Sequence, residues 1–367
     1  MSDTTGSADA NPARALPTGV TGATIPDRRP IDLAVVVKLI ARYDLGDLQE
    51  GPRPIGGTAN LNVSIVTARG HFVLRRRHAR YSAPACVAFD HALMERLAIH
   101  KLPTPLALHS LDSLRWTELG GDIYEVYDYR DGGPHDRTSL AQIRAAGDAL
   151  GRYHAATEGW TPPPGKDWPR YDDPAQLIPS LADMDGDLRA AMSPEDHAYL
   201  MAQTDRIARE LPDSVYDSVP RQVIHGDYHP ANVSFVGDQI GGIYDLDWAT
   251  VQPQLRDIAD GLIFFAGVRD GDVDSSDIRL LTRTWLPSTE RSDAFLEAYA
   301  RRRPVGDERA LLPLFMRARW LYCRTIGRSK VPEDERIAYF TFGLLEPLRA
   351  LDELERSGYF SKNRNRA

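Results

Sequence analysis

His225-Gly226-Asp227-Tyr228-His229-Pro230-Ala231-Asn232, followed by Gly242-Ile243-Tyr244-Asp245-Leu246-Asp247-Trp248, is the stretch on which the fold assignment depends. The first segment has the spacing H-x-D-x-x-x-x-N. Enzymes that transfer phosphoryl groups use this spacing to place an Asp against the attacking hydroxyl and an Asn against a magnesium ion. Asp245 follows Asn232 by thirteen positions, and Mg²⁺ that bridges phosphates needs a carboxylate ligand of this kind. The sequence therefore predicts a phosphoryl-transfer site.

Two short strands are predicted after this loop, at residues 233–236 and 239–244, with the turn Gly237-Asp238 between them. Asn232 precedes the first strand and Asp245 follows the second, so an antiparallel pair would bring both to one end of the hairpin. The alternative is a strand-turn-strand unit whose His and Asp side chains only cap turns. The motif and the position of Asp245 together favour the catalytic interpretation.

Composition sets the class of protein. The chain has 367 residues, of which 42% are hydrophobic and 26% charged, as in ordinary globular proteins large enough for two lobes. A net charge of −8 argues against a nucleic-acid partner. Two cysteines cannot form a disulfide framework, which suits a reducing cytoplasm. No apolar run approaches the ~20 residues that cross a membrane, so we expect no membrane partner.

Periodicity predicts an α+β chain with a small β-rich N-terminal lobe and a larger helical C-terminal lobe. Helices are expected at residues 31–43, 86–99, 140–154, 177–192 and 194–211, and strands at 61–67, 71–75, 115–118 and 122–129. The predicted organisation is a disordered leader at 1–30, a mainly antiparallel N-lobe at 31–133, a helical C-lobe at 134–356 and a basic tail at 357–367.

These residues resemble the aminoglycoside phosphotransferase and choline kinase-like family, which has the protein-kinase-like fold. The resemblance covers about residues 50–350 and depends mainly on the H-G-D-x-H-P-x-N loop and on Asp245. Phe89-Asp90-His91-Ala92-Leu93 and the glycines before the first hairpin are similar to the bacterial homoserine kinase-like branch. The protein-kinase motifs Asp-Phe-Gly and Ala-Pro-Glu do not occur, which argues against a protein substrate.

The resemblance implies a role for each motif residue. Asp227 would be the catalytic base, with His225 bracing its loop, and Asn232 and Asp245 would bind Mg²⁺. The other cofactor implied is ATP. The acceptor would be the hydroxyl group of a small molecule.

The resemblance also assigns the nucleotide-binding residues, with one departure from the family pattern. The family often has Lys where this chain has Arg75 and Glu where it has Asp90. Arg75 still offers a permanent cation for the phosphates and a fork for a carboxylate. Asp90 is its expected partner, with Glu95 as the rival, and the alternative for Arg75 is an exposed strand end.

A glycine loop before the first hairpin is the other expected nucleotide contact. It runs from Gly56 through Gly57 to Asn60, and backbone N–H groups freed by glycine can approach a phosphate. It could equally form a tight turn. Its position ahead of the hairpin favours ATP binding through Gly57 and Asn60.

Three further residues remain open between two roles. Asp247 could hold a second metal or contact the substrate, or be an ordinary strand-end carboxylate. His229 could orient the substrate or only close a turn. Arg324 and Arg317 share a helix face and would suit a carboxylate or phosphate on the acceptor, although surface arginines covering apolar neighbours are as plausible.

The expected function is that of an ATP- and Mg²⁺-dependent small-molecule kinase, with amino sugars, aminoglycosides and homoserine-like alcohols as possible acceptors. The alternative is an inactive nucleotide-binding or scaffold protein of the same fold. The intact set of Asp227, Asn232 and Asp245 counts against that alternative. The sequence alone leaves the acceptor, the choice between ATP and GTP and the oligomeric state undetermined.

Overall fold

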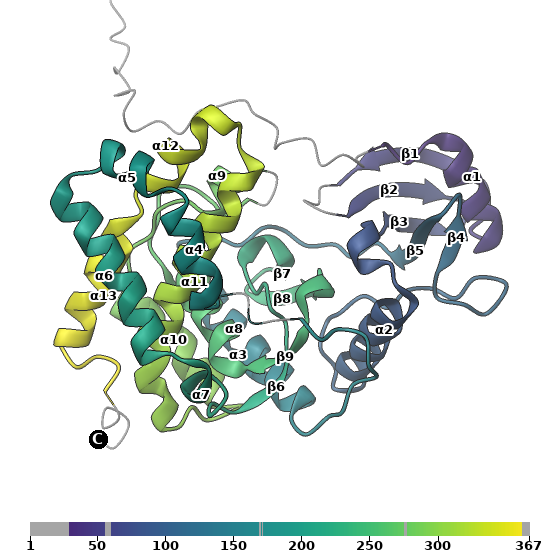
Figure 1. Ribbon diagram of the computed structural model, residues 1–367. Coiled ribbons are helices and arrows are strands. Elements are labelled where there is room, and N and C mark those ends of the chain that lie inside the picture. The colour runs from purple at the N-terminus through teal and green to yellow at the C-terminus, as the bar shows by residue number, and fades with distance from the viewer. Residues whose placement is uncertain (1–28, 56–59, 169, 171, 275–276, 362–367) are drawn as a thin grey trace, which may run out of the picture.

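The structure, a computed structural model, describes residues 29–55, 60–168, 170, 172–274 and 277–361. A β-sheet lobe stands beside a larger helical lobe, and the connecting chain passes between them (Figure 1). This arrangement confirms the predicted two-lobed α+β fold. Gly57, nearly all of the expected leader and the end of the basic tail lie outside the described residues.

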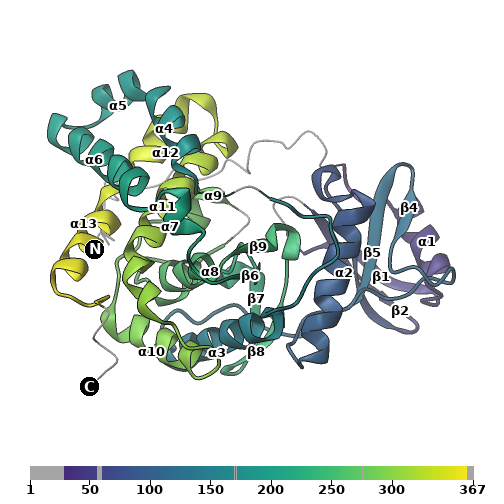
Figure 2. The same ribbon diagram turned by 60° about the horizontal axis from the view of Figure 1, so that its bottom comes forward.

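The small lobe is built on one antiparallel sheet of five strands in the order β1-β2-β3-β5-β4. The strands are β1 (Leu48–Pro54), β2 (Leu61–Thr67), β3 (Gly70–Arg76), β4 (Thr117–Leu119) and β5 (Asp122–Asp128). Helix α1 (Leu33–Arg42) begins where the side chain of Asp32 accepts a hydrogen bond from the amide of Val35. Helix α2 (Pro84–Ile99) stands between the sheet and the helical lobe (Figure 2).

The register of the sheet places two arginines on one face. Arg75 pairs with Asn62 on β2 and with Glu125 on β5. The amide of Arg77 donates to the carbonyl of Ile123, so the pairing continues past the end of β3. Because side chains alternate along a strand, Arg75 and Arg77 point to the same side.

The helical lobe surrounds a large apolar core. Its longer helices are α3 (Leu140–Thr157), α4 (Pro174–Ala182), α6 (Pro194–Glu210), α8 (Gln254–Gly261), α10 (Thr289–Ala300), α11 (Leu312–Gly327) and α13 (Leu345–Arg356). Short helices complete it at α5 (Asp185–Ala191), α7 (Asp213–Tyr216), α9 (Ile278–Leu281) and α12 (Arg336–Thr341). Helices α3 and α10 approach closely because Gly147 has no side chain; a Cβ there would lie 2.2 Å from the carbonyl oxygen of Phe295.

Two small two-stranded sheets position the segment that carries the H-x-D-x-x-x-x-N motif. Strand β6 (Arg221–Ile224) pairs with β9 (Thr250–Pro253), and β7 (Val233–Val236) pairs with β8 (Gln239–Ile243). Residues 225–232 connect β6 to β7. Gly226 has a φ of +80°, and a Cβ there would meet the carbonyl of Trp248 at 2.3 Å. Only glycine fits where this loop crosses the turn after β8.

The structure corrects the predicted elements in two places. The segment expected to link the first helix to the hairpin contains β1, and the helix expected at 177–192 is interrupted after α4. Strand β1 contains Pro52 and Pro54, which an edge strand tolerates because its outer face needs no N–H donor.

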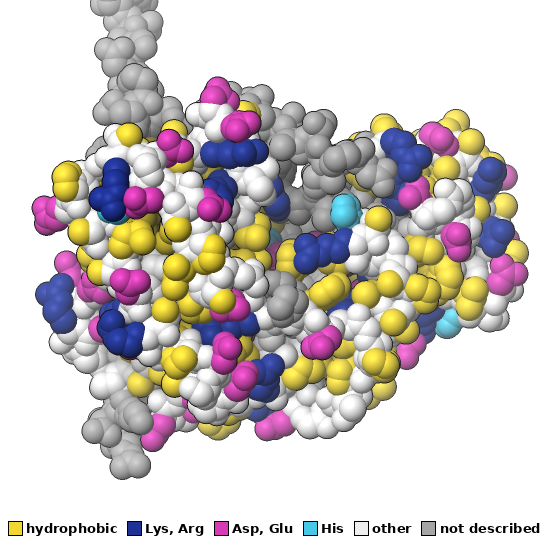
Figure 3. All heavy atoms as spheres, viewed as in Figure 1, with side chains coloured by type: hydrophobic (Ala, Val, Ile, Leu, Met, Phe, Trp, Pro, Cys, Tyr) yellow, Lys and Arg dark blue, Asp and Glu magenta, His cyan; other side chains and the backbone are white. Residues whose placement is uncertain are grey.

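The described surface carries mixed charge. On the face in Figure 3, basic and acidic side chains are interspersed over both lobes. Among the described helices, none has the length and apolar character needed to cross a membrane.

Candidate active site

A cavity of about 750 Å³ lies between the two lobes and is lined by both. From the sheet it receives Val73, Arg75 and Tyr127, and from the helical lobe it receives Arg269 and Arg319. Residues of the catalytic loop and of the turn after β8 form its middle. Asp227 and Asn232 of the H-x-D-x-x-x-x-N motif therefore line this cavity. His225 lies behind its lining.

A buried Asp at the start of α8 braces the catalytic loop. Asp257 accepts hydrogen bonds from the amides of His225 and Gly226 at 2.6 and 2.8 Å, and its side chain contacts His154 at 3.1 Å. His225 is fully buried and contacts the carbonyl of Tyr244 through Nε2 at 2.9 Å. Its Nδ1 accepts from the amide of Asp227 at 3.3 Å. His225 thus ties the loop to the turn after β8, which agrees with its expected bracing role.

Asp227 projects into the cavity with two cationic or polar neighbours. Arg319 of α11 donates to its Oδ1 at 3.0 Å, and His229 lies 3.2 Å from its Oδ2. Burial opposes the charge of this carboxylate, but His229 and Arg319 hold the pKa of Asp227 well below its usual range. The group is therefore ionised and able to accept a hydrogen bond from a hydroxyl group at neutral pH.

Asn232 and Asp245 lie at the same end of the β7–β8 hairpin, as predicted. The amide of Tyr244 donates to the carbonyl of Asn232 at 2.9 Å, which fixes the two segments side by side. The side-chain nitrogen of Asn232 donates to the carbonyl of Asp227 at 2.9 Å. Asp245 has a left-handed backbone, with φ 58° and ψ 67°. Such a conformation is uncommon for a residue other than glycine and occurs often at functional sites.

Asp245 and Asp247 are crowded carboxylates. Partial burial and the charge of Asp247 raise the pKa of Asp245 to about 6, with Arg75 acting in the opposite direction. Burial also opposes the charge of Asp247, but Arg75 and Arg77 keep its pKa below the usual value. Asp245 is therefore the less well compensated carboxylate of the two, and a cation bound beside it would favour its ionised form.

The donor set fits a hard divalent cation such as Mg²⁺. Asn232 and Asp245 offer amide and carboxylate oxygens, which are the ligands that Mg²⁺ prefers. The crowding of Asp245 against Asp247 is a cost that a bound cation would relieve. Within the described ranges, no three His, Cys, Asp or Glu side chains are grouped as a metal site. Mg²⁺ in kinases is commonly held by one or two protein carboxylates together with substrate phosphates.

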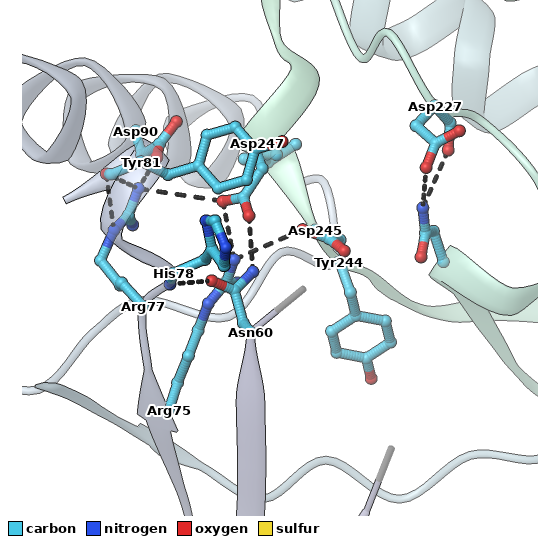
Figure 4. Close-up of polar contacts among 12 residues, drawn as sticks. Asn60, Arg75, Arg77, His78, Tyr81, Asp90, Asp227, Tyr244, Asp245 and Asp247 are labelled. Atoms are coloured by element: carbon cyan, nitrogen blue, oxygen red, sulfur yellow. Dashed lines mark hydrogen bonds and ion pairs between the residues drawn. The ribbon is translucent and has the colours of Figure 1, made fainter. Parts of the chain in front are cut away.

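Arg75 lies at the cavity and joins the sheet to these carboxylates. Its Nη2 donates to Asp247 at 2.7 Å and to Asp245 at 3.3 Å (Figure 4). Asn60 donates to the other oxygen of Asp247 at 2.5 Å, and its own carbonyl accepts from the amide of His78 at 2.9 Å. Figure 4 shows Asp227 apart from this network, beyond Asp245. Asp247 is therefore buried between Asn60 and Arg75 and is not an exposed strand-end carboxylate.

The expected pair between Arg75 and Asp90 does not form. Asp90 accepts from Arg77 at 2.6 Å and also forms an ion pair with Lys166. The rival partner, Glu95, pairs with Arg115 at 3.1 Å. The reason is the register: Arg77 lies one pleat closer to α2 on the same face, so it reaches Asp90 while Arg75 extends to the turn after β8.

Arg324 is also placed differently from the expectation of an acceptor contact. Its side chain is 1% exposed, and its guanidinium donates to backbone carbonyls, including those of Thr282 at 2.8 Å and Phe342 at 2.7 Å. Arg317 is likewise buried against Gln203 and Asp352. These arginines hold the end of the helical lobe together. Their helix does reach the cavity, but through Arg319.

Sequence reasoning missed three residues that the fold brings to the site. Arg319 contacts Asp227 and also Asp260, whose other oxygen accepts from the amide of Tyr228 at 3.3 Å. Lys166, in the Pro-rich loop, donates to the carbonyls of Leu246 and Asp247 at 2.7 and 3.0 Å. Each of the three lies outside the motif along the chain, so none has a local signal.

The fold and the site together define a class of protein: two-lobed kinases in which one loop supplies the base and an Asn, and the next hairpin supplies a metal-binding Asp. Comparison with known proteins agrees. The model of the phosphotransferase enzyme family, APH, matches residues 51–312. The chain belongs to this family.

Curated relatives of this chain include homoserine kinases. The chain is 26% identical over 307 residues to homoserine kinase of Bradyrhizobium sp. strain BTAi1, covering 79% of this chain and 83% of the relative. It is 27% identical over 319 residues to homoserine kinase of Bradyrhizobium diazoefficiens, covering 80% and 84%. This chain is therefore a small-molecule kinase with an alcohol group as acceptor.

Solved structures show the same fold at low identity. An amicoumacin kinase superimposes with a TM-score of 0.61 at 15% identity, covering 88% of this chain and 94% of the other. A microcompartment-associated aminopropanol kinase gives a TM-score of 0.62 at 16% identity, covering 89% and 98%. At these identities the likeness establishes the fold and leaves the acceptor undefined.

Proposed function

We propose that this chain transfers the γ-phosphoryl group of Mg·ATP to a hydroxyl group of a small polar metabolite. One observation carries the proposal: ionised Asp227 faces the same cavity as Asn232 and Asp245. Catalysis of phosphoryl transfer consists mainly of positioning and charge stabilisation. The parts required are therefore a base and a pair of metal-binding residues that face the same cavity. The amicoumacin kinase was solved with AMP-PNP and Ca²⁺, which supports a nucleotide and a divalent ion.

Each residue has a distinct task in this proposal. Asp227 accepts the proton of the acceptor hydroxyl. The hydroxyl oxygen bonds to the γ-phosphorus of ATP while the bond between that phosphorus and the oxygen of the leaving ADP breaks. His229 and Arg319 orient Asp227. Asn232 and Asp245 would hold Mg²⁺, which when bound neutralises charge on the phosphate oxygens.

The nucleotide would occupy the sheet side of the cavity. Val73, Met94, Tyr127 and Ile243 form an apolar lining there, which suits a planar base. Arg75 would exchange its contact with Asp245 for the phosphates, because a guanidinium binds phosphate oxygens strongly. It would keep its hydrogen bond to Asp247, which Asn60 holds in place.

An acceptor panel tests the proposed function. Homoserine, 3-aminopropan-1-ol, choline, methylthioribose, amino sugars and aminoglycosides would each be incubated with the enzyme and Mg·ATP, with release of ADP as the readout. The expected result is ADP release that depends on one acceptor class and stops when EDTA removes the metal. ADP release that is independent of divalent metal in the presence of a good acceptor would reject the mechanism.

A further inference from the structure

The cavity has an end that the phosphoryl-transfer chemistry does not use. Apart from Arg319, which orients Asp227, its lining there includes Arg137, Arg269 and Arg291, together with the carboxylates Asp272 and Asp274. Asp272 lies 3.5 Å from Arg137 and is exposed. This end is therefore rich in arginine, whereas the nucleotide end is apolar and the middle is acidic.

Arg269 is the least compensated of these cations. Arg269 is 7% exposed, and one of its guanidinium nitrogens donates to the carbonyl of Ile263. Its Nε and Nη1 are buried without a hydrogen-bond partner, and no ion pair to it occurs among the described residues. Burial, together with the charges of Arg291 and Arg283, lowers the pKa of Arg269. An arginine in this state lacks the anion that ordinarily accompanies a buried charge.

Arg291 does not supply that anion and adds to the positive charge. Its three nitrogens donate to backbone carbonyls, at 2.9 Å to Ala266, 2.9 Å to Phe265 and 2.6 Å to Arg137. Burial and the nearby charge of Arg137 lower the pKa of Arg291. Among the residues that the structure describes, it too forms no ion pair with a carboxylate.

The position of Arg269 links it to the reacting centre. The ring of Phe264 lies 5.4 Å from the guanidinium carbon of Arg269, 5.9 Å from that of Arg319, and 5.6 Å from the ring of His229. Arg319 and His229 both contact Asp227. One phenylalanine thus separates the unpaired arginine from the side chains that hold the base, a spacing that a short molecule can bridge.

We infer that Arg269 binds a carboxylate group on the acceptor, so that the substrate is a small hydroxy acid whose hydroxyl group reaches Asp227. This inference rests on the proposed function and specifies the acceptor class. A polycationic acceptor such as an aminoglycoside would meet the repulsion of Arg269 and Arg291 at this end.

The local backbone favours a carboxylate over a phosphate. Arg269 follows the C-terminal end of α8 and the π-helical turn Leu262–Ala266, and it donates to a carbonyl of that turn. A helix C-terminus carries partial negative charge, whereas phosphate sites commonly use the N–H groups of a helix N-terminus. A singly charged carboxylate is repelled less there than a phosphate dianion.

The test uses acceptors that differ only in the carboxylate. Homoserine is compared with 3-aminopropan-1-ol, the same chain without that group, and 4-hydroxybutyrate with 4-hydroxybutyramide. A small sugar phosphate tests the alternative anion. The expected result is that kcat/KM for the hydroxy acids exceeds that of their partners at least tenfold. Arg269→Gln should then lower kcat/KM about a hundredfold for the hydroxy acids and less than about threefold for the acceptors without a carboxylate.

Two variants control for charge and folding. Arg283→Gln removes one positive charge from the same region, where Arg283 donates to the carbonyl of Asp270, and it should leave the preference for hydroxy acids unchanged. Arg269→Lys keeps the charge and should recover part of the loss. Thermal unfolding of each variant checks that it folds.

A binding measurement decides the matter without a productive acceptor. Butyrate should raise the melting temperature of the wild-type enzyme in the presence of Mg·ADP, and butyramide should not. The inference is overturned if butyrate and butyramide act alike, if the amides or the sugar phosphate are the better acceptors, or if Arg269→Gln lowers all acceptors equally. Failure of the proposed function is separate, because it would appear as loss of Mg·ATP binding or of metal-dependent ADP release in the wild type.

Discussion

At the residue scale, Arg75 and Arg77 share a face of the sheet but hold different carboxylates. Arg75 bridges Asp245 and Asp247 at the cavity. Arg77 ties Asp90 of α2 to the sheet. In kinases of this fold one cation usually contacts both the helix acid and the phosphates. Here the two contacts belong to two arginines, so Arg75 is available for phosphate without releasing α2.

This division of contacts predicts which residues are energetically coupled. In a double-mutant cycle on the free energy of unfolding, Arg77→Met and Asp90→Asn should couple by about 1–3 kcal/mol, because they form a buried hydrogen-bonded ion pair. Arg75→Met and Asp90→Asn should be additive to within about 0.5 kcal/mol. Coupling between positions 75 and 90 equal to that between 77 and 90 would contradict the observed pairing. In kinetics, Arg75→Met should raise KM for ATP more than KM for the acceptor.

The proximity of Asp227, Asn232 and Asp245 could be predicted at this scale, but the side chains that contact them could not. Asp227, Asn232 and Asp245 lie in one short segment, so their spacing carries the information. Arg319 lies 92 positions from Asp227, and it reaches the site only because α11 packs against α8. The same helix made Arg324 a plausible acceptor residue, since periodicity alone does not tell which of two buried arginines faces a cavity.

At the element scale, the loop between α3 and α4 clamps α2 to the turn after β8. Lys166 forms an ion pair with Asp90 and donates to the carbonyls of Leu246 and Asp247. Trp168 donates to the same Asp247 carbonyl at 3.2 Å. One buried ammonium therefore connects the helix of the small lobe to the backbone beside Asp245, the proposed metal ligand.

Removing this clamp should weaken nucleotide binding. Lys166→Met keeps much of the side-chain volume but removes one donor from each of two carbonyls and leaves Asp90 without its ion-pair partner Lys166, at a total cost of about 1–3 kcal/mol. We expect a lower unfolding temperature and a KM for Mg·ATP raised at least threefold, with the hydroxy-acid KM nearly unchanged. Arg170→Met, in the same loop, is the matched control. Unchanged nucleotide binding in Lys166→Met, with normal stability, would show that the loop has no part in the site.

Elements with clear periodicity were predicted well, and those set by tertiary pairing were not. Helix α2 and the β2–β3 hairpin have strong local patterns and lie within a few residues of the expected bounds. Strand β1 contains two prolines and no alternation, and only its position at the sheet edge makes it a strand. Strand β9 forms by pairing with β6 across the catalytic loop, a contact that no local sequence pattern indicates.

At the scale of the whole molecule, the cavity between the lobes is graded from apolar to acidic to basic. The sheet end suits the nucleotide base, the turn after β8 suits the metal, and the end near Arg269 suits an acceptor anion. In the proposed function this gradation would order the two substrates along one axis, with Asp227 between the phosphates and the acceptor hydroxyl. We therefore infer the proposed function from the arrangement of the two lobes and not from any single residue.

Stability of the whole molecule should depend on pH through its buried histidines. Burial lowers the pKa of His135 to about 4 and also lowers the pKa of His154 and of His225. Unfolding returns each to water, where its pKa is about 6.5, so the unfolded chain binds more protons below that pH. This contribution to stability is complete above about pH 6.5 and is lost as the pH falls toward the folded-state pKa values.

His135 offers the cleanest comparison, because it packs on the rings of Phe235 and Phe265. Between about pH 6.5 and 4, the wild type should lose up to about 1.4 kcal/mol per pH unit relative to His135→Phe. The two proteins are compared because burial also raises the pKa of Asp260 to about 6. That shift makes the free energy of unfolding rise as the pH falls, equally in both proteins, so it cancels in the difference between them. Chemical denaturation at each pH gives the two curves, and parallel curves would mean that His135 is not buried in the neutral form.

The role of Asp227 as the base is tested most directly by the rate of phosphoryl transfer by Asp227→Asn, measured as acceptor-dependent ADP release. The affinity of the same variant for Mg·ATP is measured by calorimetry. Asn keeps the shape of the side chain and its contacts near Arg319 but cannot accept the proton, so general-base catalysis worth about 10²–10⁴-fold should be lost. We predict that kcat falls at least a hundredfold while the affinity for Mg·ATP stays within about threefold. A variant that retains more than about a tenth of the wild-type kcat would contradict the assignment of Asp227 as the base.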